Sequence, residues 1–231
     1  LLLVPVIFLV IRERPTSLGP QQPAVGSALA SGGMSLRDAL RTRNFWLLAF
    51  IAMFSFFSII GTQAHLNLYM LSRGFSQMDA SLSYTVLFYV GLGGKLLNGL
   101  LADRLGKKRV FVTTLAVMAT GTLVLALPRT GSIWAGLVLF GFGWGGLYTL
   151  LQLLAADYFG PRHLGKILGV ITVLDTLGGG LGPPTLGAIL DSTGSYDNAF
   201  LPVILLVGLA FILSMLFRTG KDAGAGAPAV T

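Results

Sequence analysis

The chain has 231 residues, of which 54% are hydrophobic and only 11% are charged, with a mean hydropathy of +0.78 and a net charge of +7. A soluble domain usually carries about a quarter charged residues because its surface faces water, so this composition argues against a soluble enzyme or binding domain. The absence of cysteine excludes disulfides and thiolate metal sites. Most of the side chains are therefore expected to face lipid.

The chain begins with an apolar run, residues 1–11, which is followed rather than preceded by the basic residues Arg12 and Arg14. A signal peptide has the opposite order, so we interpret this run as the end of a transmembrane helix that starts upstream. Residues 12–43 form a linker that is rich in Gly, Pro, Ala and Ser. A segment of this composition cannot bury enough apolar area to fold alone. The end of the linker, SLRDALRTR, is expected to form a short amphipathic helix at a membrane surface.

Six apolar segments follow within residues 44–218, each long enough to cross a hydrocarbon core of about 30 Å as a helix of about 20 residues. Their expected bounds are Phe45–Leu68, Ala80–Ala102, Val110–Leu127, Ile133–Ala155, Ile167–Leu190 and Ala199–Phe217. The short alternating runs of a membrane β-barrel do not occur. The sequence therefore predicts an all-α, polytopic membrane helical bundle of six full spans plus the end of a preceding span, with residues 219–231 as a tail.

The basic residues are divided unequally between the two sets of connections. If the linker is cytoplasmic, the cytoplasmic side carries 13 of the 16 basic residues and the opposite side only Arg73 and Arg129, while Lys95 falls inside a span. Positively charged loops mark the cytoplasmic side of a membrane protein. The linker and the C-terminus are therefore expected to be cytoplasmic, in a plasma (inner) membrane, and the net charge needs no nucleic-acid partner.

The most specific string is GLLADRLGKKR, from Gly99 to Arg109, at the cytoplasmic end of the second full span. It resembles the signature loop of the major facilitator superfamily, in the copy between family helices 8 and 9. The RERP segment and the Phe45–Trp46 pair are similar to the monocarboxylate and oxalate/formate antiporter-like branch of that family. The resemblance extends over essentially the whole chain. It implies that the six spans are the C-terminal half of a twelve-helix transporter whose N-terminal half is missing here.

The resemblance also implies that this string acts as a gate. Asp103 is expected to meet the N-terminal dipole of a neighbouring helix and basic residues, and so to hold one face of the transporter closed. Gly99, because it has no side chain, is expected to let a neighbouring helix approach closely. The other residues expected in this gate are Arg104, Gly106, Lys107, Lys108 and Arg109. An ordinary basic loop is the alternative, although it would not follow this ordered pattern.

Two ionisable residues fall inside predicted spans, where charges are costly and usually functional. Lys95 lies eight residues before Asp103, and Asp175 lies nine residues after Lys166, which places them about 12 Å and about 13.5 Å deep. In the family the substrate site lies between the two halves near this depth. Lys95 is therefore a candidate to bind a carboxylate substrate, and Asp175 to carry a proton or orient the substrate. A structural ion pair between them, or snorkelling of Lys95, is the alternative.

Polar and aromatic stripes add further candidates. Trp144, Tyr148 and Gln152 recur every four residues on one face of the fourth span, and Tyr148 and Gln152 are candidate substrate contacts. The second span carries a similar stripe of Tyr84, Phe88, Gly91 and Lys95. Such stripes are more often packing surfaces than ligand contacts. His65 titrates near neutral pH when unperturbed and is a possible proton-coupling residue, although a lone His there is more often a hydrogen-bonded bystander.

The string GFGWGG, from Gly141 to Gly146, matches the dinucleotide fingerprint G-x-G-x-x-G. That fingerprint needs a preceding strand and a soluble helix, whereas these glycines lie inside a predicted span. They are therefore expected to allow close helix packing, and the same is expected of Gly178–Gly182.

Together these features predict a secondary active transporter of a small, monocarboxylate-like organic anion, working by alternating access with proton coupling or exchange. The expected partners are the anionic substrate, a coupling ion, the lipid bilayer and the missing N-terminal half. No cofactor, metal or enzymatic activity is expected, because the two histidines, His65 and His163, are far apart and there is no cysteine. No G-x-x-x-x-G-K-[ST] motif occurs either, so this chain is expected to supply no ATP-driven motor. The alternatives are a multidrug efflux transporter, in which Lys95 is structural, and a non-transporting membrane receptor or sensor.

Overall fold

The computed structural model describes residues 33–127 and 130–217, and every regular element in these ranges is an α-helix. The helices are α3 (Leu36–Leu40), α4 (Arg43–Ser72), α5 (Gln77–Leu105), α6 (Lys107–Leu125), α7 (Thr130–Phe159), α8 (Leu164–Thr193), α9 (Tyr196–Ala199) and α10 (Leu201–Met215). The apolar run at residues 1–11, most of the linker and the tail after residue 217 lie outside the described residues.

Within residues 33–127 and 130–217, six helical stretches are long and apolar enough to cross a membrane, with α9 and α10 counted together as the sixth, so the predicted all-α bundle is confirmed. The helices begin slightly before the predicted starts, with α9 counted as the start of the sixth span. At α4 and α5 the helix extends to a polar cap, because the hydroxyl groups of Thr42 and Ser76 accept backbone N–H groups there. α6 and α8 begin without a side-chain cap. The predicted last span is interrupted at Phe200, since Pro202 near the start of α10 has no N–H with which to continue α9.

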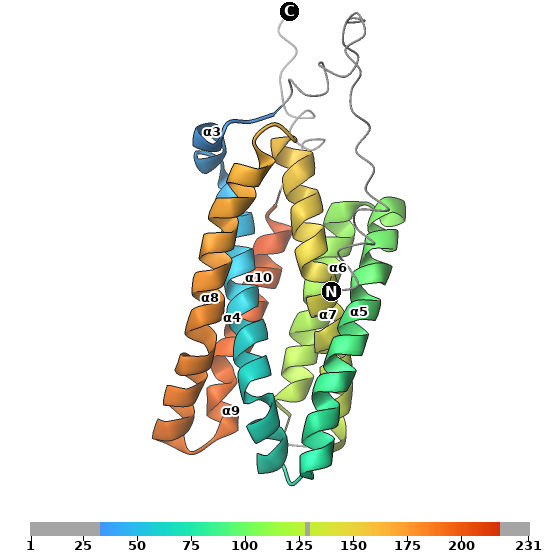
Figure 1. Ribbon diagram of the computed structural model, residues 1–231, viewed down its shortest axis with the longest axis vertical. Helices are drawn as coiled ribbons and strands as arrows, with labels where there is room; N and C mark the ends of the chain where they lie inside the picture. Colours follow the sequence, from blue (N-terminus) through green and yellow to red (C-terminus); the bar gives the residue numbers. More distant parts are fainter. Residues whose placement is uncertain (1–32, 128–129, 218–231) are drawn as a thin grey trace, which may run out of the picture. The chain divides into compact units, whose positions relative to one another are not determined.

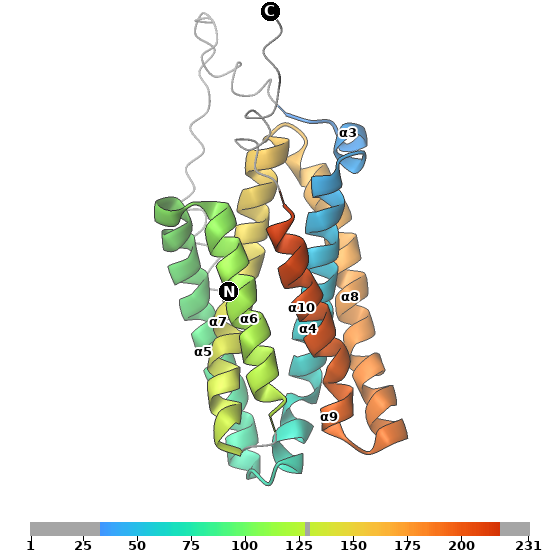
Figure 2. The ribbon, with the colours of Figure 1, turned by 180° about the vertical axis from the view of Figure 1, so that it is seen from behind.

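The spans pack in two groups, α4 with α8 and α10, and α5 with α6 and α7, and the groups meet mainly where α10 contacts α6 and α4 contacts α5. α4 packs along α8, α7 packs along both α5 and α6, and α10 contacts α4 and α6 (Figure 1; Figure 2). Glycines make two of these contacts close. A Cβ atom added to Gly178 would collide with the backbone carbonyl of Met53, and one added to Gly145 with that of Gly91. The glycine-rich strings of α7 and α8 therefore serve helix packing, as predicted.

The α5–α6 and α7–α8 connections lie at the same end of the bundle as α3 (Figure 1). We call it the basic end, because the described basic residues of the predicted cytoplasmic side lie there. They are Arg37, Arg41, Arg43, Arg104, Lys107, Lys108, Arg109, Arg162 and Lys166. The connections α4–α5, α6–α7 and α8–α9 lie at the opposite end, as short links between antiparallel spans require.

α3 forms where the short amphipathic helix was expected, with Ser35 capping its first turn. It is tied to the bundle on both sides. The backbone N–H of Met34 donates to the carbonyl of Phe159 at the end of α7 (2.7 Å), and the Trp46 indole donates to the carbonyl of Leu40 (2.9 Å). The end of the linker is thus part of the folded bundle.

At the opposite end, Arg73 joins the α4–α5 turn to α9. Its guanidinium pairs with Asp197 and lies over the Tyr69 ring, 5.2 Å from the ring centroid. The Tyr69 hydroxyl in turn donates to the carbonyl of Leu125 at the end of α6. Burial lowers the pKa of Arg73, but the hydrogen bond to Asp197 and the neighbouring charges outweigh burial, so the pKa is raised. This charged residue therefore stabilises the junction of three elements.

Candidate functional site

Lys95 lies on α5 beside the stripe of residues that packs against α7. That stripe consists of Ala80, Ser83, Leu87, Gly91, Gly94, Asn98 and Ala102. Lys95 itself is exposed, and within the described part of the chain its ammonium group makes no hydrogen bond or ion pair. Ten residues separate it from the end of α5 at Leu105, which is roughly 15 Å of helix. A cation thus lies well inside a span, without a carboxylate from these helices.

The predicted stripe of Tyr84, Phe88, Gly91 and Lys95 on α5 lies beside the α7 stripe that contains Trp144. The rings of Phe88 and Trp144 pack edge to face with centroids 5.3 Å apart, and a Cβ atom on Gly91 would collide with the same indole. Because Lys95 follows Gly91 by four residues, it lies one turn further along this face. The structure therefore brings the two predicted stripes together on neighbouring helices.

Tyr148 and Gln152 continue the α7 stripe toward the basic end, and both are exposed. The Tyr148 ring packs edge to face on Phe56 of α4, with centroids 5.8 Å apart. The Tyr84 hydroxyl of α5 donates to the backbone carbonyl of Gln63 on α4 at 2.7 Å. Phe56 carries no distinguishing signal in the sequence, because it is one of several phenylalanines in an almost wholly apolar span. Side chains of three helices, α4, α5 and α7, thus meet around the two stripes.

Asp175 lies on α8, away from the α5 and α7 stripes, on the face of α8 that packs against α4. It is only 4% exposed. The Thr176 hydroxyl donates to its Oδ1 atom at 3.3 Å. Among the described residues, Asp175 and Lys95 form no ion pair. The structure therefore holds the two midplane charges apart, and Asp175 is a buried carboxyl group with one long hydrogen bond.

His65 contacts α8 and α9 rather than the stripes of α5 and α7. Its Nε2 atom lies 3.0 Å from the carbonyl oxygen of Pro183, and its ring packs edge to face on Tyr196 at 6.2 Å. These contacts favour a structural role over proton coupling. In the described ranges no three His, Asp or Glu side chains are placed to hold a metal ion.

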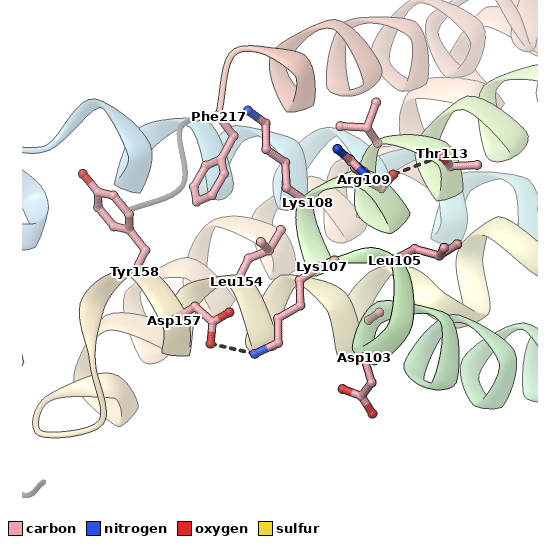
Figure 3. Close-up of a pocket in the computed structure, with 13 residues that line it drawn as sticks. Asp103, Leu105, Lys107, Lys108, Arg109, Thr113, Leu154, Asp157, Tyr158 and Phe217 are labelled. Carbon is pink, nitrogen blue, oxygen red and sulfur yellow. Dashed lines mark hydrogen bonds and ion pairs between the residues drawn. The ribbon is translucent and has the colours of Figure 1, made fainter. Parts of the chain in front are cut away.

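The signature string forms the end of α5, a turn at Gly106 and the start of α6 (Figure 3). Gly106 has a φ of 91°, a conformation that disfavours residues with a Cβ atom. The ammonium group of Lys107 pairs with Asp157 near the end of α7, at 2.6 Å. This ion pair joins α6 to α7 at the basic end, and Asp157 was not among the residues predicted for the gate.

Asp103 is exposed and makes no hydrogen bond or ion pair with any residue in the described ranges, Arg104 and Arg109 included. In Figure 3 its carboxylate lies apart from the Lys107–Asp157 pair. The expected network around Asp103 is therefore absent from these six spans, and it stays a prediction for contacts with other parts of the protein.

Gly99 also differs from expectation. A Cβ atom added there would meet nothing within 4 Å, so no described helix approaches it closely. The close approaches on α5 are at Gly91 and Gly94, where α7 packs. The physical reason is the helical period: Gly99 lies next to the stripe that faces α7 rather than in it.

A sequence model described as the Major Facilitator Superfamily matches residues 1–183 and 91–230 of this chain. Among curated proteins, monocarboxylate transporter 14 of Homo sapiens is 30% identical over 198 residues, which make up 81% of this chain and 36% of that protein. Monocarboxylate transporter 2 of Meriones unguiculatus is 30% identical over 152 residues, 64% of this chain and 31% of that protein. The chain thus spans about a third of the length of the curated relatives it matches.

Among solved structures, the crystal structure of the E. coli fucose:proton symporter aligns with a TM-score of 0.72 at 17% sequence identity. The alignment covers 94% of this chain and 52% of the symporter chain. At this identity the comparison shows the fold alone. The helical arrangement described above is thus shared with about half of a larger membrane protein.

Proposed function

We propose, because this chain belongs to the major facilitator superfamily, that it forms the C-terminal half of a secondary active transporter that moves a small organic anion by alternating access. The six spans and the transporter relatives support this proposal. The orientation proposed places the basic end in the cytoplasm and the protein in a plasma (inner) membrane, because basic loops are retained on the cytoplasmic side.

The proposal that the substrate is an anion rests on the environment of Lys95. A charged side chain inside a membrane is costly and is usually paired or faces an aqueous pathway. Lys95 is exposed and has no acidic partner in the described helices, so a bound carboxylate would supply the missing charge. Trp144, Tyr148 and Gln152 on the neighbouring stripe would contact the remainder of the substrate. The names of the monocarboxylate transporter relatives support a substrate with one carboxylate group.

The signature loop is proposed to control the conformation rather than to contact the substrate. Its residues, from Gly99 to Arg109, run from the last turns of α5 through the turn at Gly106 into the first turn of α6, at or near the basic end. The Lys107–Asp157 pair links two helices there, and an exposed pair of this kind contributes only about 0–1 kcal/mol. Such a link can break and re-form during a transport cycle.

Uptake of labelled lactate, formate and oxalate by the full-length protein in proteoliposomes tests this function. We expect saturable uptake of at least one of them, accelerated either by an acid external pH or by anion preloaded inside the vesicles. Acceleration by pH indicates symport, and acceleration by preloaded anion indicates exchange. If none of the three is taken up but a hydrophobic drug is expelled, the anion proposal fails and multidrug efflux replaces it.

Asp175 is the proposed carrier of the coupled proton. Burying an ionised carboxylate in an apolar site is expensive unless it is well hydrogen-bonded, and a proton on Asp175 would remove that cost. Asp175→Asn keeps the size of the side chain but cannot exchange a proton. We therefore expect it to abolish stimulation of uptake by a pH gradient while anion exchange at equal pH continues.

The matched control for this prediction is Asp191→Asn, which changes an exposed carboxylate in the last turn of the same helix, α8. It should leave the pH response unchanged. A normal pH response in Asp175→Asn would show that the coupled proton is carried elsewhere, with His65 as the next residue to test.

A further inference from the structure

A hollow of about 1310 Å³ lies at the basic end, bordered by the α5–α6 turn, the last turns of α7 and the chain just after α10 (Figure 3). Its basic lining residues are Lys107, Lys108 and Arg109, and its acidic ones are Asp103 and Asp157. Lys107 is paired with Asp157. Because the three cations outnumber the two carboxylates, the lining carries a net positive charge.

The cations lie where the fold by itself disfavours them. All three occupy the first turn of α6, which contains no acidic residue, and no side chain caps this helix. The N-terminal end of a helix carries a partial positive charge, which repels cations. Arg109 is exposed, and in the described chain its guanidinium makes no hydrogen bond or ion pair. An anion in the hollow would relieve this repulsion.

Apart from Thr113 and the hydroxyl group of Tyr158, the rest of the lining is apolar. Leu105 of α5 is exposed and Val112 of α6 is half-buried, whereas Leu154 and Phe217 are almost completely buried. A small hydrated anion has no use for such a surface, whereas an amphipathic anion can place its charge on the cations and its apolar part on these side chains. The hollow also begins where α5 ends and α6 starts, at the expected level of the lipid headgroups.

We propose that this hollow binds an anionic glycerophospholipid of the cytoplasmic leaflet, with its phosphate against Lys108 and Arg109 and its acyl chains on the apolar lining. Basic pockets between transmembrane helices on the cytoplasmic side are suited to lipid headgroups. The inference rests on the proposed function for the orientation of the basic end. Such a lipid would touch both α6 and the end of α7, the two helices that the Lys107–Asp157 pair joins, and so would regulate the proposed gate.

The test measures lipid binding to the full-length protein in detergent by native mass spectrometry, and thermal stability with and without added lipid. Phosphatidylglycerol is expected to bind and to raise Tm, whereas phosphatidylcholine and inorganic phosphate are not. Arg109→Gln should weaken phosphatidylglycerol binding about fivefold, and Lys108→Gln combined with Arg109→Gln roughly 25-fold, since each cation contributes about equally.

The control is Arg41→Gln, an exposed cation at the same end that does not line the hollow, and it should bind phosphatidylglycerol normally. Misfolding is distinguished from loss of the site by the Tm without lipid. Removing a cation from the start of a helix is favourable, so Arg109→Gln without lipid should be at least as stable as the parent protein.

Unchanged phosphatidylglycerol binding in the double variant would overturn the proposal, as would equal binding of phosphatidylcholine. An equal rise of Tm with inorganic phosphate would assign the hollow to a free anion instead. Because lipid binding is measured without transport, failure of the uptake experiment leaves this result standing, and failure here leaves the anion-transport proposal standing.

Discussion

Replacing Lys95 by glutamine is expected to reduce uptake of the anionic substrate by the full-length protein by about 10- to 100-fold. This is the loss that corresponds to about 1.5–3 kcal/mol for a hydrogen bond to a charged group. Glutamine retains most of the length and a hydrogen-bond donor but removes the charge that a carboxylate requires. Lys95→Arg keeps the charge and is expected to retain more activity than Lys95→Gln. The measurement is the initial rate of uptake at several substrate concentrations.

The matched control is Lys166→Gln, which removes an exposed lysine at the start of α8 at the basic end. Its uptake should equal that of the parent protein, and all variants must be present in the membrane in equal amounts. Unaltered uptake in Lys95→Gln would remove the substrate role of Lys95. That result would favour an apolar substrate, for which the exposed side chains of Phe88 and Tyr148 and the half-buried Trp144 provide the contacts.

The second large effect is expected on stability. Gly145→Ala places a Cβ atom on the carbonyl oxygen of Gly91, so α5 and α7 must separate or bend. Overpacking of this kind costs about 1–3 kcal/mol and more where backbone is struck. We expect Tm of the full-length protein to fall by roughly 5–10 °C, from about 2–4 °C per kcal/mol for a domain of this size. Tm is measured by heating the detergent-solubilised protein and following the loss of its monodisperse peak in size-exclusion chromatography.

Gly208→Ala is the control, because it is also in the interior of a helix, α10, and a Cβ atom there meets nothing within 4 Å. Alanine has a higher helix propensity than glycine by about 1 kcal/mol, so Tm should stay the same or rise. Equal decreases in the two variants would mean that the α5–α7 contact is not the reason for the glycine.

Membrane spans could be predicted from this sequence almost completely, because each depends on a local property. About 20 consecutive apolar residues cross the bilayer whatever their neighbours do. The interruption at Phe200 was not predicted, although Pro202 supplied the signal. A hydropathy average over a whole segment does not register a single proline. The proline nevertheless interrupts the helix, because it has no backbone N–H to donate.

The candidate site was predictable only as separate stripes. The four-residue spacing of Trp144, Tyr148 and Gln152 defines a face of one helix, but no periodicity states which helix lies opposite. The contact between Phe88 and Trp144 depends on how closely the glycines let α5 and α7 approach. The contact of Phe56 with Tyr148 depends on where α4 lies against α7. Lys95 could be recognised in advance because a charge in an apolar span is conspicuous on its own.

The sequence by itself determined the fold class, the number of spans and the family resemblance, because these depend on composition, length and the order of residues along one segment. Only the tertiary structure decided which charges meet: Lys107 pairs with Asp157, whereas Lys95 and Asp175 lie apart and Asp103 has no partner in the described residues. Ion pairs form at a few ångströms, and distances that short depend on the packing of helices far apart in the chain.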